Sequence, residues 1–162
     1  MQLATDDPHL KSIYVIGSLR NPEIPTIGNA IRQLGYDVFD DWYAAGPTAD
    51  DSWKEYEQSR GNDYRAALNG RAARHVFEFD KHHLDRCDAG LLVLPAGSSG
   101  HLELGYMLGT GKSGFVLMDN PDRWDVMYQF AHGVFFNLQD LLAALITSTR
   151  QPVGTDCRVR GN

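Results

Sequence analysis

The sequence has little cysteine, a shortage of positive charge and no long hydrophobic run. Its 162 residues include two cysteines, Cys87 and Cys157, which lie too far apart to suggest the disulfide framework of a small secreted domain. Lys and Arg number 15 against 21 Asp and Glu, and the net charge of −6 disfavours a non-specific nucleic-acid binder or a polybasic membrane-surface protein. We therefore expect a reducing, cytoplasmic environment and small-molecule ligands.

Apolar runs are present but short. None approaches the roughly 20 residues that cross a bilayer, and residues 1–8 lack the basic and apolar regions of a signal peptide, so we expect neither export nor membrane insertion. The hydrophobic fraction of 43% is ordinary for a folded soluble chain. The length fits one domain over residues 1–162, with an ordered body over about 11–147 and a looser tail over 148–162.

Short apolar runs alternate with helical patterns along the chain. The predicted strands cover residues 12–17, 36–39, 90–94, 115–118 and 133–136. The predicted helices cover residues 22–34, 62–85, 100–108, 124–130 and 138–146. Residues 50–60 show no clean period, and we interpret them as a surface excursion. The alternation predicts an α/β fold: a small doubly wound, flavodoxin-like or Rossmann-like domain with five parallel strands and helices on both faces.

Glu103 is the most unusual residue, because it lies in a helical run, residues 100–108, that is apolar almost all round. An ionised carboxyl group buried without partners costs several kcal/mol or takes up a proton. In an open α/β sheet, the loops after the strands are also where ligands bind. We place Glu103 in the first turn of its helix, where the dipole favours the ionised form. It is either a compensated structural or capping carboxylate or the group that does the chemistry.

The loop after the first strand contains Gly17, Ser18 and Arg20. Backbone N–H groups and the dipole of the next helix favour an anion at such a position, and an arginine fork suits phosphate. A plain turn with an exposed arginine is an equally good interpretation. The segment is neither a GxGxxG nor a Walker sequence, so it does not predict a dinucleotide or triphosphate site.

The loop after the third strand, Gly97, Ser98 and Ser99, is the equivalent position in the next unit. Its hydroxyl groups can cap the following helix or bind a phosphate or a sugar hydroxyl. Asp40 and Asp41 follow the second strand, where they can bind ribose hydroxyls or face water.

A run of possible metal ligands, Asp80, His83 and Cys87, has helical spacing near the end of a predicted helix. No CxxC pair or second helix completes a closed site, so we predict a solvated helix end with no metal and no cofactor. The aromatic residues most often belong to the core or its rim, although one or two near the strand ends can stack on a nucleobase. They are Tyr14, Trp42, Trp53, Trp124 and Tyr128.

Four segments together resemble the nucleoside 2-deoxyribosyltransferase family, including its branch of nucleoside 5′-monophosphate N-glycosidases. They are residues 14–20, Asp80, Asp88 and residues 98–106. The most specific match is residues 101–106, which resemble the nucleophile helix of ExGxA type, with Met107 where that pattern has alanine.

The resemblance implies a mechanism. Glu103 would attack C1′ of the sugar and form a covalent glycosyl-enzyme, as in retaining glycosidases. Asp80 matches the aspartate that manages the proton of the leaving base, and Tyr14 matches a tyrosine that positions the nucleophile. The glycosyl group would then pass to water, as in a hydrolase, or to another nucleobase, as in a deoxyribosyltransferase.

The resemblance also bears on substrate and assembly. Gly97 stands where the transferases usually carry an aspartate, and together with Ser18, Arg20 and Ser98 it favours a 5′-monophosphate substrate and water as acceptor. Family members complete each site from a neighbouring subunit, which implies a homodimer or higher homo-oligomer in which Tyr128 or its surroundings reach across. Nucleic-acid polymers and membranes are not expected partners.

Two other functions fit the same loops. A non-catalytic nucleotide sensor would bind without turnover, and a flavodoxin-like redox module would hold FMN on these loops. Both are weaker explanations of Glu103, since neither needs a carboxylate in an apolar helix.

Overall fold

The computed structural model describes the chain over residues 10–149, and its side chains to residue 147. Five strands form one sheet in the order β2-β1-β3-β4-β5, and every neighbouring pair is parallel. The strands are β1 (Ser12–Ile16), β2 (Asp37–Phe39), β3 (Ala89–Val93), β4 (Ser113–Leu117) and β5 (Gly133–Phe135). The predicted doubly wound α/β architecture is confirmed. Cys157 and nearly all of the predicted loose tail lie outside the described residues.

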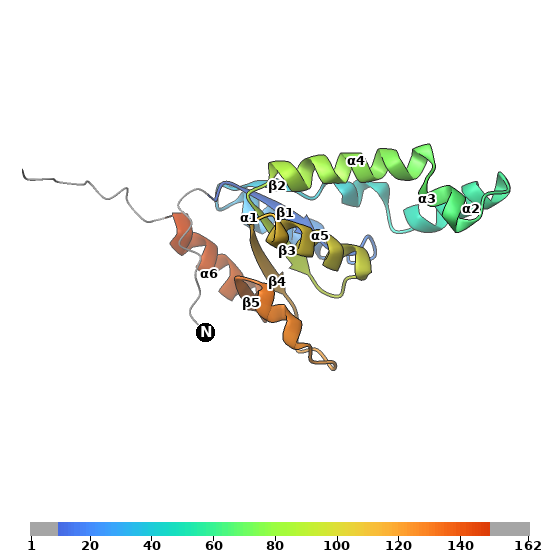
Figure 1. Ribbon diagram of the computed structural model, residues 1–162. Helices are drawn as coiled ribbons and strands as arrows, with labels where there is room; N and C mark the ends of the chain where they lie inside the picture. The colour runs from blue at the N-terminus through green and yellow to red at the C-terminus, as the bar shows by residue number, and fades with distance from the viewer. Residues whose placement is uncertain (1–9, 150–162) are drawn as a thin grey trace, which may run out of the picture.

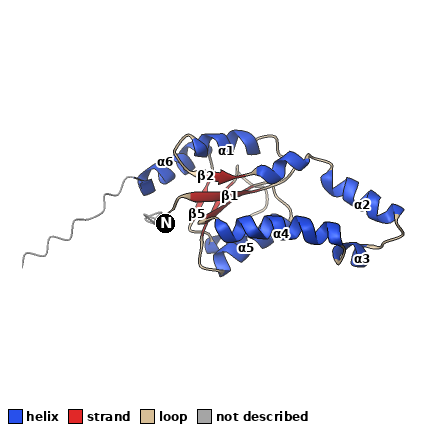
Figure 2. Ribbon diagram, turned by 90° about the horizontal axis from the view of Figure 1, so that it is seen from above, coloured by secondary structure: helices blue, strands red, loops and turns tan. Residues whose placement is uncertain are grey.

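Helices cover both faces of the sheet (Figure 2). Helices α1 (Ile24–Arg32) and α6 (Leu138–Thr149) lie on one face, and α4 (Arg71–Arg86) and α5 (Ser98–Gly109) lie on the other. Alternate residues of β1 point to opposite faces, so that Ile13 and Val15 join the core under α1 and α6, whereas Tyr14 and Ile16 join the core under α4 and α5.

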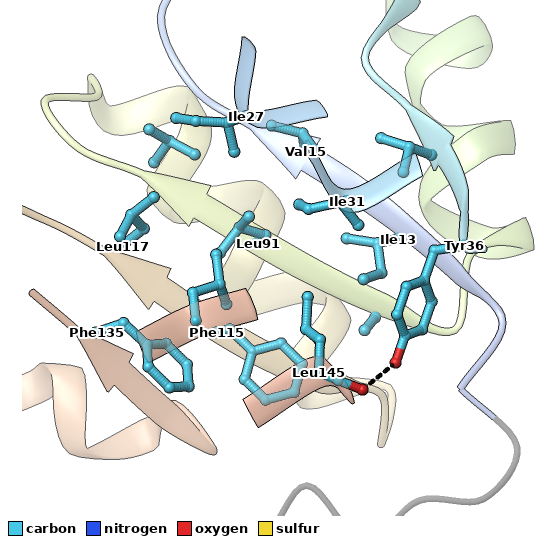
Figure 3. Packing of buried hydrophobic residues seen from close by; sticks show 14 of the residues in the cluster. Ile13, Val15, Ile27, Ile31, Tyr36, Leu91, Phe115, Leu117, Phe135 and Leu145 are labelled. Atoms are coloured by element: carbon cyan, nitrogen blue, oxygen red, sulfur yellow. Dashed lines mark hydrogen bonds between the residues drawn. The ribbon is translucent and has the colours of Figure 1, made fainter. Parts of the chain in front are cut away.

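The core on the α1 and α6 face is closed and almost wholly apolar (Figure 3). The hydroxyl group of Tyr36, which is buried in this core, donates a 2.9 Å hydrogen bond to the carbonyl oxygen of Leu145 in α6. This bond satisfies a polar group that would otherwise be buried without a partner. The face therefore has the composition of a structural core.

Helix α5 packs unusually close to the sheet because glycines lie beneath it. A Cβ atom at Gly90 of β3 would lie 2.7 Å from Sδ of Met107, and one at Gly114 of β4 would lie 2.7 Å from Cδ2 of Leu108. A side chain at either position would force Met107 or Leu108 to move, so these glycines accommodate the present packing of the helix. The packing fixes the height of α5, and hence of Glu103, above β3 and β4.

Two segments differ from the sequence predictions. The predicted long helix over residues 62–85 is two helices, α3 (Tyr64–Leu68) and α4, and the single-helix prediction is wrong. The chain breaks at Gly70, whose extended backbone begins α4 and where a Cβ atom would lie 3.0 Å from the carbonyl oxygen of Ala67. The surface excursion over residues 50–60 is the helix α2 (Ala49–Ser59).

Helices α2 and α3 project beyond the end of the sheet (Figure 1). We call them the arm. Glu57 is the one charged residue that α2 buries, and its carboxylate accepts a 2.6 Å hydrogen bond from the Asn62 side chain. With so little buried apolar surface, α2 has no hydrophobic period to reveal it in the sequence.

The remaining elements are short. A 3-10 helix over Asp41–Ala45 follows β2, and another over Val126–Phe130 precedes β5, where the sequence predicted a short helix. Over residues 10–149, no helix has the length and apolar character needed to span a bilayer.

Candidate functional site

Three residues proposed for catalysis come from three different elements on the α4 and α5 face. Tyr14 lies in the middle of β1, Asp80 in α4, and Glu103 in α5. Burial is the main cause that raises the pKa values of Tyr14 and Glu103. The charges of Glu103 and Asp80 add to the shift of Tyr14, and the charge of Asp80 adds to that of Glu103. Residues 14, 80 and 103 are therefore close enough to form one electrostatic group.

Glu103 carries the most informative pKa. Burial, reinforced by the negative charge of Asp80, raises the pKa of this half-buried carboxyl group from 4.5 to about 7. No described residue offsets that shift by donating a hydrogen bond to it. The placement in the first turn is wrong: α5 begins at Ser98, so Glu103 lies in the second turn, where the helix dipole no longer dominates.

Tyr14 and Asp80 share the same shielded environment. Tyr14 is only 1% exposed, and burial, followed by the charges of Glu103 and Asp80, raises its pKa far above the ordinary value. Burial also raises the pKa of Asp80. A phenol that keeps its proton can meet a carboxylate only as a hydrogen-bond donor. Tyr14 is thus suited to orient a carboxylate rather than to act as a base.

An aromatic wall adjoins Tyr14. The ring of Phe39, at the end of β2, lies 4.9 Å from that of Tyr14 and stacks on His83 at 3.7 Å with an interplanar angle of 8°. Burial, followed by the charge of Arg86, lowers the pKa of His83, and Arg86 Nε donates to its Nδ1 at 3.3 Å. His83 is therefore a half-buried wall residue with a lowered pKa, whereas His82, Asp85 and Arg86 at the same helix end are exposed.

The loop after β1 is tied to the arm. Ser18 Oγ accepts a hydrogen bond from the backbone N–H of Arg20 at 3.2 Å. The guanidinium group of Arg20 forms a 2.9 Å ion pair with Asp51 in α2, and its Nε donates to the carbonyl oxygen of Pro47 at 3.5 Å. Gly17 packs against α1, since a Cβ atom there would lie 2.6 Å from Ile24. No local pattern in the sequence indicates that Asp51 contacts Arg20.

The loop after β2 presents exposed and half-buried groups side by side. Asp41, an expected ribose ligand, is exposed at the start of the 3-10 helix. Trp42, the next residue, donates from Nε1 to the carbonyl oxygen of Val15 at 2.7 Å, which ties this loop to the end of β1.

The loop after β3 leads directly into α5. Gly97 occupies the N-cap position without a side-chain hydrogen bond, and Ser98 and Ser99 are exposed in the first turn, so the capping role considered for these serines is not observed. The backbone N–H groups of that turn have no side-chain cap. They are therefore available to an anionic or hydroxyl-bearing ligand.

His101 joins this loop to the segment before β5. Its Nδ1 lies 2.9 Å from the carbonyl oxygen of Gly97, and its Nε2 lies 3.1 Å from the hydroxyl oxygen of Tyr128. Tyr128 thus contacts α5 of its own chain. No role was predicted for His101, although its position in the motif, two residues before Glu103, was a signal in the sequence.

Asp88 lies at the opposite end of the sheet from these loops. Its carboxylate accepts 2.9 Å hydrogen bonds from the backbone N–H groups of Lys11 and Ser12 and a 2.8 Å bond from the Ser12 hydroxyl. It therefore joins the beginnings of β1 and β3. Over residues 10–149, no group of three or more His, Cys, Asp or Glu side chains is arranged to hold a metal ion.

The fold and the site define a doubly wound α/β protein with a shielded carboxyl pair and a tyrosine on one face of the sheet. Among solved structures, the chain is similar to a 2-deoxyribosyltransferase from the psychrotolerant bacterium Bacillus psychrosaccharolyticus. The TM-score is 0.57 at 18% sequence identity, with 81% of this chain and 90% of that chain covered, and the expected likeness in fold is confirmed. No protein-family model matches the sequence, and no curated protein matches it.

Proposed function

We propose that the protein cleaves the N-glycosidic bond of a nucleoside, a deoxynucleoside or their 5′-monophosphates through a covalent glycosyl intermediate on Glu103. The observation that carries this proposal is the carboxyl group of Glu103, held by burial and by Asp80 at a pKa of about 7. Ionised carboxylates are not left in such a position for stability alone, because their desolvation is unfavourable. The fold shared with a 2-deoxyribosyltransferase supports the proposal.

The chemistry proceeds in two displacements. An ionised Glu103 oxygen attacks C1′, so that a C1′–O bond forms while the C1′–N bond breaks and its electron pair leaves with the base. Water or a second nucleobase then attacks C1′ and restores the carboxylate. Two inversions retain the configuration of the sugar, as in retaining glycosidases.

Asp80 and Tyr14 assist from the other two elements. The raised pKa of Asp80 suits a carboxyl group that shares a proton with the departing base. The Tyr14 phenol stays protonated, and its proposed role is to donate a hydrogen bond to the ionised Glu103 carboxylate in the substrate complex and so orient it for attack. Burial and the charge of Asp80 both oppose ionisation of Glu103. The partial positive charge that develops at C1′ of a bound substrate would favour the ionised carboxylate.

The loops at the strand ends supply binding groups. Gly17, Ser18 and Arg20 after β1, and Gly97 with its neighbouring serines after β3, are proposed to hold the sugar and its 5′ substituent. The uncapped N–H groups at the start of α5 support this assignment. Asp41 is proposed to bind ribose hydroxyls, and Tyr128, held by His101, to border the entrance.

We also propose a cytoplasmic homodimer or higher homo-oligomer. The arm and α4 leave large apolar side chains exposed, which a second copy would cover. They include Tyr64, Leu68, Val76, Phe77 and Phe79. Light scattering at micromolar concentration tests this, and a monomer would refute it.

A chromatographic assay tests the proposed reaction. The protein is incubated with a panel of nucleosides and 5′-monophosphates, with and without a free acceptor base. Release of base identifies a hydrolase, and formation of a new nucleoside identifies a transferase. Full base release by Glu103→Ala with every substrate of the wild type would refute the nucleophile, and binding with no turnover would identify a sensor instead.

A further inference from the structure

Positive charge is scarce around the ends of the strands. The loops over residues 17–23, 40–48, 94–97 and 118–125 carry two cationic side chains, Arg20 and Arg123. Arg123 is 90% exposed and approaches Asp125 only to 4.0 Å. The same loops carry six carboxylates, namely Glu23, Asp40, Asp41, Asp119, Asp122 and Asp125. Arg32 of α1 pairs with Asp40 and is thereby engaged by a carboxylate as well. A dianionic phosphate entering here therefore depends strongly on Arg20.

Arg20 is already engaged by the arm. Its Nη2 contacts Oδ2 of Asp51 at 2.9 Å, and its Nε donates to the Pro47 carbonyl oxygen at 3.5 Å. Nε and Nη2 form one of the guanidinium edges that can bind phosphate through two parallel hydrogen bonds. A phosphate that uses this edge must displace Asp51, and one that uses Nη1 must bind next to the Asp51 charge.

We propose that Asp51 is a specificity-determining residue: by competing for the Arg20 guanidinium group, it sets how well the site accepts a 5′-phosphorylated substrate relative to the unphosphorylated one. This inference rests on the proposed function of the site. It assigns a role to a residue of the arm that lies 31 positions from Arg20 in the sequence.

The geometry makes Asp51 a modulator rather than a permanent block. Both partners are well exposed, with side chains 69% and 59% accessible, and exposed ion pairs of this kind are weak. Asp51 also lies in the first turn of α2, where the helix dipole stabilises a carboxylate without help from Arg20. Release of Arg20 to a phosphate is therefore feasible, but it is opposed by the competing charge.

The test compares a nucleoside with its own 5′-monophosphate in wild type and in Asp51→Asn. The readout is the ratio of kcat/KM for the monophosphate to kcat/KM for the nucleoside. We expect the ratio to increase about fivefold in Asp51→Asn, the effect of removing one exposed competing charge. The increase should vanish when Arg20→Gln is present as well, because the competition acts through Arg20.

Asp50→Asn is the matched control. Asp50 also lies in the first turn of α2 but is not the residue that Arg20 contacts, so its removal changes the arm charge equally and should leave the ratio unchanged. A ratio that is unchanged or lower in Asp51→Asn would overturn the proposal, since Asp51 would then only anchor the arm or orient Arg20. An equal increase in Asp50→Asn would overturn it too.

Calorimetric titration with inorganic phosphate separates this inference from the proposed reaction. If no substrate is turned over, the proposed function fails, but the competition still predicts tighter phosphate binding in Asp51→Asn than in wild type. Binding should be lost in Arg20→Gln. Equal phosphate affinity in wild type and Asp51→Asn would overturn the competition whatever the enzyme assay shows.

Discussion

Each face of the sheet buries a tyrosine, but the two tyrosines lie in different environments. On the α1 and α6 face, Tyr36 is 5% exposed and donates its hydroxyl proton to the Leu145 carbonyl oxygen at 2.9 Å. On the α4 and α5 face, Tyr14 is 1% exposed and lies in the negative field of two carboxyl groups, Glu103 and Asp80. One face pairs its polar group, whereas the other concentrates groups that resist ionisation.

This contrast suggests that the two faces of one sheet serve different purposes, stability on one and the proposed reaction on the other. Apolar contacts and a satisfied hydrogen bond stabilise the first face, and none of its residues has a proposed role in the reaction. The second face holds an acidic pair whose charges repel each other and are poorly solvated, an arrangement that lowers stability when both are ionised. Substitutions should therefore affect folding on one face and reaction on the other.

The largest expected effect comes from substituting one central residue on each face. Glu103→Gln removes the proposed nucleophile and should reduce kcat/KM for base release by at least about 1000-fold, with the fold retained. Leu141→Ala, a 1% exposed residue of α6, should lower the free energy of unfolding by about 2–5 kcal/mol and leave kcat of the folded protein nearly unchanged. Base-release kinetics and urea unfolding measure both, and an inactive but stable Leu141→Ala would contradict the separation.

Stability should depend on pH through Glu103. The carboxyl group keeps its proton in the folded chain up to a pKa of about 7 but loses it near 4.5 when unfolded, so stability falls as the pH rises across this window. Glu103→Gln should therefore be more stable than wild type at pH 8 by up to about 3 kcal/mol, with little difference at pH 4. Thermal unfolding at the two pH values checks this, and a constant difference would argue against a shifted pKa.

Some elements of the fold and the candidate site could be predicted from the sequence, and others could not. The five strands were predictable because β-branched and aromatic runs bounded by glycine are typical of buried parallel strands. Glu103 was identified because a carboxylate interrupts an apolar helix. The break at Gly70 was missed because the residues on either side of it share one helical period.

Long-range contacts account for the rest of what the sequence did not show. The shift of the Glu103 pKa depends partly on Asp80, which lies in another helix. The Arg20–Asp51 ion pair joins a loop to the arm, and α2 itself buries too little apolar surface to have a period. Pairings of this kind follow from the packing of elements, which a local pattern does not contain.

The two tyrosines give a matched pair of substitutions. Tyr36→Phe should cost about 1 kcal/mol of stability, because the Leu145 carbonyl oxygen loses its donor, and should leave the reaction unchanged. Tyr14→Phe should reduce kcat for base release by about tenfold or more with little loss of stability, because it removes the donor proposed to orient Glu103 in the substrate complex. Equal effects of the two substitutions on kcat would contradict the proposed difference between the two faces.

The smallest expected effect concerns the spacing of α4 and α5. Tyr106 donates a 2.6 Å hydrogen bond to Asp85, whose other carboxylate oxygen forms a 2.6 Å ion pair with Lys81, the residue after Asp80. Tyr106→Phe removes this exposed link, so Asp80 and Glu103 should be less tightly coupled. The rise of kcat/KM through about pH 7 should move to lower pH by a few tenths of a unit, the size of a weak exposed contact. Tyr64→Phe, on the arm, should leave the profile unchanged.

Mass spectrometry of acid-quenched enzyme tests the nucleophilic role of Glu103 most directly. The protein is mixed with a cleaved substrate in the absence of acceptor base, quenched within the first turnover, digested and mapped. We expect an added glycosyl group on the peptide that contains Glu103, with one equivalent of free base released and no such adduct in Glu103→Gln. Base release by wild type with no adduct, together with undiminished release by Glu103→Gln, would contradict the account.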